Sequence, residues 1–180
     1  MDKPWDVKND YEWMIYAQHY GIPTRLLDFT NSHIISLMFA VESAFNNYND
    51  DDGVVWFLDP LKLNNKSCCR SQIVTLSENE SISLDDCDVP IVVQGRKLNG
   101  RISAQNGVFV YFQDRSEALD AIINDTDILR KVIIKGPCKK DILVSLYSMG
   151  IGMTQIYPEL TSVAKDIIMK DNIKQYLKEE

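Results

Sequence analysis

Hydrophobic residues near the start of the chain recur three to four positions apart and predict a helix over residues 9–20. One apolar stripe of this helix consists of Trp13, Tyr16, Ala17 and Tyr20, and a neighbouring stripe consists of Tyr11, Ile15, Gln18 and His19. Asn9 is a typical N-cap, and Glu12 three residues later completes the pattern of a capping box. Gly21 suits the position just after a helix and Pro23 does not continue one, so the helix is predicted to end there.

The rest of the chain mixes short apolar segments with helical patterns. Extended segments are predicted at residues 26–29, 53–58, 89–94, 107–112 and 130–135. A second helix is predicted to be capped by Thr30, Asn31 or Ser32 and to run to about residue 45. Further helices are predicted at residues 114–124, 139–149 and 159–170, with 171–178 as a continuation of the last. Because strands and helices do not alternate strictly, we expect an α+β fold. The prediction is a single domain over residues 1–180, with a mixed or antiparallel sheet core and flanking helices.

Three of these assignments depend on particular residue patterns. Residues 53–58 are apolar on both faces, which predicts a central strand. Asp114 is predicted to cap the helix that follows it, with Glu117 completing a box. Residues 61–88 are polar and weakly periodic, so we expect an irregular segment with one short helix.

Composition and charge argue against a membrane protein and against a nucleic-acid-binding protein. The longest apolar run, residues 34–41, is too short to span a membrane, and residues 1–6 lack the pattern of a signal peptide. We therefore expect a cytoplasmic protein that does not contact membranes. The net charge of −7 disfavours binding to nucleic acid. The basic residues at 95–97 and 139–140 lack interleaved aromatic residues and are predicted to be solvated surface.

Cysteine and histidine usage argues against a metal centre. The chain has two histidines and no C-x-x-C pair. Its cysteines are Cys68, Cys69, Cys87 and Cys138, and without a secretory signal we expect free thiols. The G-x-S-x-G, Walker, G-x-G-x-x-G and H-E-x-x-H motifs are absent. No metal and no certain cofactor are predicted.

Polar side chains gather in residues 18–32, between the first two predicted helices. Arg25 is a candidate phosphate ligand, because a guanidinium matches phosphate with two parallel hydrogen bonds. The alternative is an ion pair with Asp28 that braces the loop, and the two roles are compatible. His19 is a candidate acid, base or ligand for a hydroxyl, against the alternative of a structural histidine. The other predicted ligand-binding residues here are Gln18, Tyr20, Thr24, Asp28, Thr30 and Ser32.

A second polar segment spans residues 100–109. Arg101, Ser103 and Gln105 occupy alternate positions, which places them on one face of an extended chain. The apolar strand that follows indicates the edge of a binding site. The alternative is a strand face turned toward solvent.

Residues 13–30, WMIYAQHYGIPTRLLDFT, followed by SLMFA at 36–40, closely resemble the FRG domain. Residues 101–109, RISAQNGVF, look like a later motif of that family, and residues 149–151 and 157–160 look like its closing segment. The resemblance covers roughly residues 9–168. The family is named for a Phe-Arg-Gly motif that lies upstream of this run, and the chain begins after that point. We expect the chain to be either a fragment or a natural short form. Whether it has a function that needs the arginine of that upstream motif is an open question at this point.

A weaker resemblance links residues 28–40 to the S-T-S element of arginine-type ADP-ribosyltransferases, in which a hydroxyl-rich strand end leads into a helix. This resemblance implies an ADP-ribosyltransferase-like fold, with NAD as the substrate and an upstream arginine on its phosphate. It places Gln105 near the position of the catalytic acid, and His19 and Gln105 are the catalytic candidates. A glutamine is not a base, so the usual carboxylate is missing there.

The leading interpretation is a nucleotide-type cleft that binds NAD, with ADP-ribosyltransferase-like or NAD-hydrolysing activity. The FRG resemblance implies a role in phage–host conflict. The alternative is a non-catalytic module that binds a protein partner. Both are carried forward as hypotheses.

Overall fold

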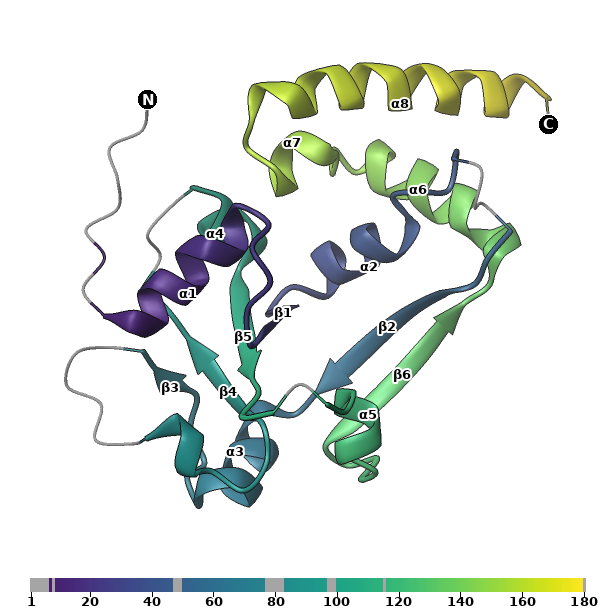
Figure 1. Ribbon diagram of the computed structural model, residues 1–180. Coiled ribbons are helices and arrows are strands. Elements are labelled where there is room, and N and C mark those ends of the chain that lie inside the picture. The colour runs from purple at the N-terminus through teal and green to yellow at the C-terminus, as the bar shows by residue number, and fades with distance from the viewer. Residues whose placement is uncertain are drawn as a thin grey trace. The chain divides into compact units, whose positions relative to one another are not determined.

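The computed structural model describes residues 7, 9–46, 50–76, 83–96, 100–114 and 116–179. The helices are α1 (Asp10–His19), α2 (His33–Val41), α3 (Pro60–Cys68), α4 (Gly100–Gln105), α5 (Leu119–Ile122), α6 (Lys139–Ser148), α7 (Met153–Ile156) and α8 (Leu160–Glu179). The strands are β1 (Leu26–Thr30), β2 (Gly53–Leu58), β3 (Val74–Thr75), β4 (Ile91–Gln94), β5 (Gly107–Tyr111) and β6 (Leu129–Ile134). Two 3-10 helices, η1 (Leu84–Asp86) and η2 (Gly136–Cys138), complete the set in the described residues (Figure 1).

The chain divides into two compact units. Unit 1 consists of Met1–Asn31, Phe57–Asn99 and Gly107–Arg130. Unit 2 consists of Ser32–Trp56, Gly100–Asn106 and Lys131–Glu180. The boundaries fall within β2 and β6, and each unit is described here by itself.

Unit 1 is built on a four-stranded sheet in the order β1-β5-β4-β3. β5 runs antiparallel to both neighbours, and Tyr111 lies opposite Leu26 on one side and Ile91 on the other. β3 runs parallel to β4. The sheet is therefore mixed and is flanked by helices, which confirms the predicted α+β class.

A buried asparagine links α3 to β4. Asn64 is fully buried, its amide donates to the Val92 carbonyl at 2.8 Å, and its oxygen accepts from the Val92 N–H at 2.7 Å. The same amide donates to the Gln72 carbonyl at 2.7 Å. In the described part of the chain, β3 pairs with residues 93 and 94 of β4 and no strand pairs with Val92 on that side, so the Asn64 amide supplies the hydrogen bonds there.

A buried ion pair anchors α1. Asn9 caps the helix as predicted and accepts from the Glu12 N–H at 2.9 Å. The Glu12 carboxylate is 1% exposed and pairs with both Nε and Nη2 of Arg96, just after β4. The prediction that Arg96 belongs to a solvated basic patch was wrong, because its charge neutralises a buried carboxylate.

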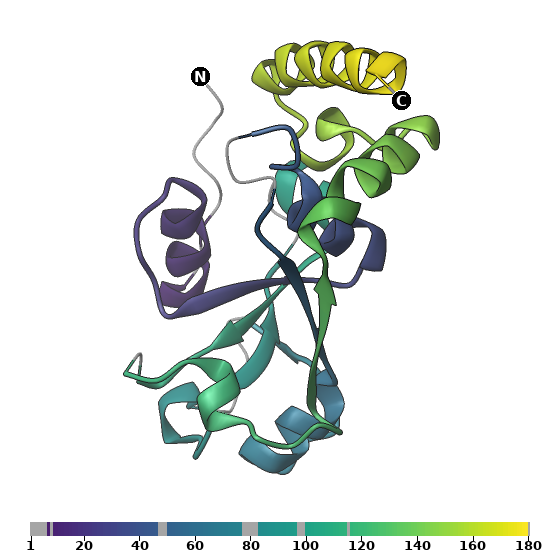
Figure 2. The same cartoon turned by 90° about the vertical axis from the view of Figure 1, so that its right-hand side faces the viewer.

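Unit 2 packs α2, α6, α7 and α8 around an apolar core, and α8 lies alongside α6 and α7 (Figure 1, Figure 2). Asp166 of α8 is buried and accepts from the Tyr147 hydroxyl, the Met153 N–H and the Thr154 N–H and hydroxyl. Burial alone would raise the pKa of Asp166, but these hydrogen bonds outweigh it and lower the pKa. A side chain at Gly152 would begin 2.7 Å from an Asp166 oxygen, so this approach requires glycine.

Several predicted elements differ from the structure. β2 belongs to a two-stranded sheet with β6, so the prediction of a central strand was wrong. The 32–45 helix ends at Val41, and turns follow. The prediction of a helix over residues 114–124 was also wrong. Asp114 accepts hydrogen bonds from the N–H and the hydroxyl of Ser116 and forms a turn, and the helical part of this range is the short α5.

Other predictions hold more closely. Residues 61–88 contain α3 as the one α-helix in their described part, together with β3 and η1. α6 and the continuous α8 match their predicted ranges. Lys139 was predicted to be solvated but is buried, and its ammonium donates to the Asp51 carbonyl at 2.9 Å. No helix in the described part of the chain is long and apolar enough to cross a membrane.

We predict that Asn64→Ala lowers the free energy of unfolding by about 3 kcal/mol, because it leaves the Val92 N–H and carbonyl buried without a partner. Urea denaturation of the purified chain measures this value. The exposed neighbour Asn65 provides the control, and Asn65→Ala should change the free energy by less than about 0.5 kcal/mol. Equal effects of the two variants would contradict the bridging role of Asn64.

Candidate functional site

The polar segment of residues 18–28 connects α1 to β1 in unit 1. α1 ends at His19, Tyr20 forms its C-cap, and Gly21 follows with a φ of +80°. A left-handed residue at this position closes the helix and redirects the chain, which is the role predicted for Gly21. β1 is then fixed by its antiparallel register with β5. The segment is therefore held at both ends by regular structure.

Three predicted site residues form one hydrogen-bonded group. The Gln18 amide donates to Asp28 Oδ1 at 2.8 Å, and the Thr24 hydroxyl donates to Gln18 Oε1. The Thr24 oxygen also accepts from the Leu26 N–H at 3.2 Å. Asp28 therefore pairs with Gln18, and the predicted Arg25–Asp28 ion pair was wrong.

Arg25 pairs instead with Asp85 of η1. Its Nη1 lies 2.6 Å from Asp85 Oδ1 and also donates to the Gln113 carbonyl at 3.4 Å. The guanidinium carbon lies 4.7 Å from the centroid of the Tyr111 ring, which is within the range of a cation–π contact. The Tyr111 hydroxyl donates to the same Asp85 oxygen at 2.7 Å. We call Arg25, Asp85, Tyr111 and Gln113 the Arg25 cluster.

The Arg25 cluster uses only one nitrogen of the guanidinium. Among the residues that the structure describes, no acceptor is hydrogen-bonded to Nε or Nη2 of Arg25. The side chain is 35% exposed. Its Nε–Nη2 edge, the edge that binds a phosphate or carboxylate through two parallel bonds, is therefore available to a ligand.

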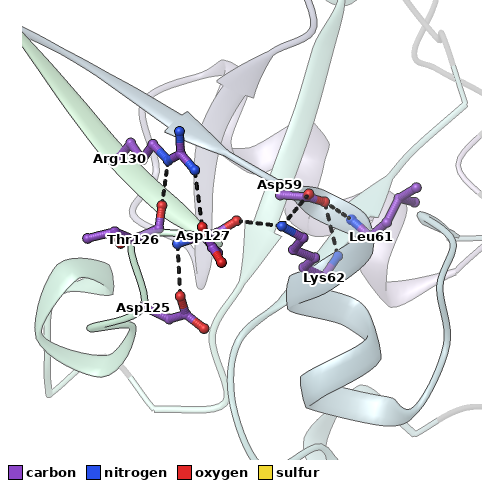
Figure 3. Close-up of polar contacts among 7 residues, drawn as sticks. All are labelled: Asp59, Leu61, Lys62, Asp125, Thr126, Asp127 and Arg130. Atoms are coloured by element: carbon purple, nitrogen blue, oxygen red, sulfur yellow. Dashed lines mark hydrogen bonds and ion pairs between the residues drawn. The ribbon is translucent and has the colours of Figure 1, made fainter.

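Two other arginines of unit 1 have this edge occupied. Arg96 binds the Glu12 carboxylate through Nε and Nη2. Arg130 donates from Nε to the Thr126 carbonyl at 2.6 Å and from Nη2 to Asp127 at 3.2 Å (Figure 3). Figure 3 also shows that Asp59 accepts hydrogen bonds from the backbone N–H groups of Leu61 and Lys62 at the start of α3. The polar contacts of this region therefore have a structural role. Arg96 and Arg130 thus use Nε and Nη2 for contacts within the protein, whereas Arg25 uses only Nη1 among the described residues.

Within the Arg25 cluster, the pKa values of Asp85 and Tyr111 are shifted in opposite directions. The hydrogen bond from Tyr111, followed by the one from Arg25, lowers the pKa of the Asp85 carboxyl. Burial, followed by the hydrogen bond to Asp85, raises the pKa of the Tyr111 hydroxyl. At neutral pH the carboxylate is charged and the phenol keeps its proton, so the pair holds Arg25 in one orientation.

Aromatic rings extend along α1 toward the same segment. The Tyr20 ring lies 4.9 Å from Tyr16 and 5.1 Å from His19, and Trp13 lies 5.7 Å from Tyr16. Trp13 and Tyr20 were predicted as part of an apolar stripe, yet they are 56% and 62% exposed. The helix buries Glu12 and, from the neighbouring predicted stripe, Ile15. His19 is half-buried, and its catalytic role stays a prediction.

The remaining predicted residues lie elsewhere. Thr30 ends β1 opposite Gly107, and Ser32 belongs to unit 2, where it caps α2 through the Ile35 N–H. Residues 100–105 form α4, so the prediction that Arg101, Ser103 and Gln105 share one face of an extended chain was wrong. α4 also belongs to unit 2.

Sequence reasoning missed Asp85, Tyr111 and Gln113. Asp85 lies in the segment predicted to be irregular, and Tyr111 was assigned only to an apolar strand. Each is far from Arg25 along the chain, and no local motif connects them. In the described residues there is no group of three or more His, Cys, Asp or Glu side chains that could hold a metal ion.

We predict that Tyr111→Phe raises the pKa of Asp85 toward the ordinary value of about 3.9, because the hydroxyl makes the strongest contribution to lowering it. Carbon-13 NMR titration of the Asp85 carboxyl measures this value. Tyr11→Phe is the matched control, because the Tyr11 ring packs edge-on against Tyr111 and has no hydrogen bond to Asp85 in the described structure. An Asp85 pKa that is the same in wild type and Tyr111→Phe would contradict the arrangement.

Comparison with known proteins bears on the same segment. Residues 2–49 match the family model of the FRG domain. No curated protein and no solved structure matches the chain. The matched residues include 13–30 and 36–40, which carried the first part of the predicted resemblance. The later parts, at residues 101–109, 149–151 and 157–160, lie outside the match. Residues 2–49 are therefore similar to the FRG domain.

Proposed function

We propose that unit 1 binds a nucleotide-type ligand, NAD or ADP-ribose, and that Arg25 binds its phosphate. The observation that carries the proposal is the orientation of Arg25. Asp85 and the Tyr111 ring fix the guanidinium through Nη1 and its face, while its Nε–Nη2 edge has no acceptor among the described residues. An arginine fixed in this way loses little further conformational entropy when it binds an anion.

The group formed by Gln18, Thr24 and Asp28 supports a nucleotide over a simple anion. Asp28 uses Oδ1 to accept from Gln18, and its Oδ2 has no hydrogen bond to the described residues. A carboxylate oxygen at the surface accepts hydrogen bonds from the hydroxyls of a ribose. In this proposal Gln18 orients Asp28, and the rings of His19 and Tyr20 contact the base or the sugar.

The chemistry after binding follows from the resemblance to ADP-ribosyltransferases. His19 is the proposed acid or base of unit 1, and Gln105 of unit 2 stays a predicted catalytic residue. The reaction would transfer ADP-ribose from NAD or hydrolyse NAD, and released nicotinamide is the product to measure. A role in phage–host conflict has the FRG resemblance as its support.

We predict that Arg25→Ala weakens the binding of ADP-ribose at least tenfold, since a charge-assisted pair of hydrogen bonds contributes about 1.5–3 kcal/mol. Isothermal titration calorimetry with ADP-ribose and with NAD measures the affinity. Arg25→Lys should recover only part of it, because an ammonium does not form the two parallel bonds.

Arg130→Ala is the matched control for this experiment, since Arg130 is exposed in the same unit and its Nε–Nη2 edge is occupied. It should leave the affinity unchanged. A folded wild-type protein that gives no heat with either ligand would overturn the proposal. So would an Arg25→Ala variant that binds as the wild type does.

A second proposed function is a module that binds a protein partner. Its support is a group of exposed apolar side chains between residues 13 and 27: Trp13, Tyr20, Ile22 and Leu27. Large apolar side chains that gather at the surface are typical of protein–protein contacts. Ile22 is the most informative of them, because it is 57% exposed and lies in the loop after α1.

We predict for this second function that Ile22→Asp abolishes capture of a partner from lysate while Arg25→Ala retains it. Affinity capture followed by mass spectrometry compares the two variants. Ile168→Asp, at a 62% exposed position of α8 in unit 2, is the control for adding a charge to an exposed isoleucine. Loss of the partner with Arg25→Ala as well would favour the nucleotide hypothesis over this one.

A further inference from the structure

The end of α3 packs against the chain that leads into β4. The Ser67 hydroxyl, in the last turn of α3, donates to the Val89 carbonyl at 2.6 Å. One turn earlier, Asn64 holds Val92 by two hydrogen bonds. The C-terminal turn of α3 and residues 87–92 are therefore neighbours within unit 1.

This packing brings two cysteines together from distant parts of the sequence. Cys68 is the last residue of α3, Cys87 directly follows η1, and, in addition to burial, the Cys68 side chain is close enough to Cys87 to raise the pKa of the Cys87 thiol. Each also lies near a carbonyl of its own segment, with Cys68 Sγ 3.2 Å from the Asn64 oxygen and Cys87 Sγ 3.9 Å from the Ser83 oxygen. Both are half-buried, and both thiols are free.

We propose that Cys68 and Cys87 form an oxidisable pair, which a small peroxide converts into a disulfide. The Cys68 thiolate attacks one oxygen of hydrogen peroxide, the O–O bond breaks, and the departing hydroxide takes up one proton and leaves as water, so that Cys68 becomes a sulfenic acid. The Cys87 sulfur then loses its proton and attacks the sulfenic acid of Cys68, which releases the second water. In sum, two thiols and hydrogen peroxide give one disulfide and two water molecules.

The order of attack follows from the surroundings of the two thiols. Burial, followed by the neighbouring Cys68, raises the pKa of the Cys87 thiol, so little of it is ionised at neutral pH. Because the thiolate is the nucleophile and the raised pKa keeps the Cys87 thiol protonated, Cys87 is assigned the second step. Raising the pH should therefore speed disulfide formation.

The disulfide would restrain η1, which Cys87 directly follows. η1 contains Asp85, which holds Arg25, and Leu84, whose carbonyl accepts from the Gln113 amide at 2.9 Å. Closing a covalent link between α3 and Cys87 limits the motion of this segment and stabilises unit 1 against unfolding. This inference rests on the packing of α3 and does not depend on nucleotide binding.

The test treats the reduced full-length chain with hydrogen peroxide and maps the cysteines by mass spectrometry under non-reducing conditions. The expected product is a monomer lighter by two hydrogen atoms, with a bond between Cys68 and Cys87. Cys68→Ser and Cys87→Ser should each abolish the product. Cys69→Ser and Cys138→Ser, at exposed thiols, should leave it intact.

Thermal unfolding and hydrogen exchange provide a second readout. The oxidised wild type should unfold at a higher temperature than the reduced form, with slower amide exchange over residues 84–88. A bond from Cys87 to Cys69, a bond between Cys68 and Cys69, or a link between two chains would overturn the proposal. Oxidation of the exposed thiols alone, with the two half-buried thiols left reduced, would overturn it as well.

Discussion

The arrangement of the Arg25 cluster in unit 1 depends on the contacts of the Tyr111 side chain. Tyr111 lies opposite residues of two neighbouring strands, packs edge-on against Tyr11 of α1, supports the guanidinium of Arg25 and donates to Asp85. A buried phenol needs an acceptor, and the acceptor here is a carboxylate that also binds Arg25. One side chain therefore connects the sheet, α1, η1 and Arg25.

This arrangement explains why Arg25 differs from Arg96. The buried carboxylate of Glu12 requires a full counter-charge, and Arg96 supplies it through two nitrogens. Asp85 is exposed and already accepts from Tyr111, so it holds Arg25 through a single nitrogen. The bonding capacity that remains on Arg25 is the physical basis for assigning it a ligand.

The periodic elements could be predicted from the sequence because local patterns define them. The cap at Asn9, the left-handed Gly21 and the long α8 follow from residues a few positions apart. The partner of Arg25 could not be predicted in this way, because Asp85 is sixty positions away and reaches Arg25 only through the packing of η1. The extended assignment of residues 100–105 failed for a related reason. Alternating polar residues fit an exposed strand, but over six residues they do not exclude a helix.

Arg25 lies within the stretch that matches the family model, whereas the residues that orient it lie outside that stretch. The matched stretch, residues 2–49, contains Gln18, Thr24, Arg25 and Asp28. The groups that orient Arg25, namely Asp85, Tyr111 and the Gln113 carbonyl, all lie outside it. The matched residues alone would therefore carry the proposed ligand-binding side chains without the support that fixes Arg25. Because η1 is part of that support, a covalent restraint at Cys87 would act on Arg25 through residues outside the matched stretch.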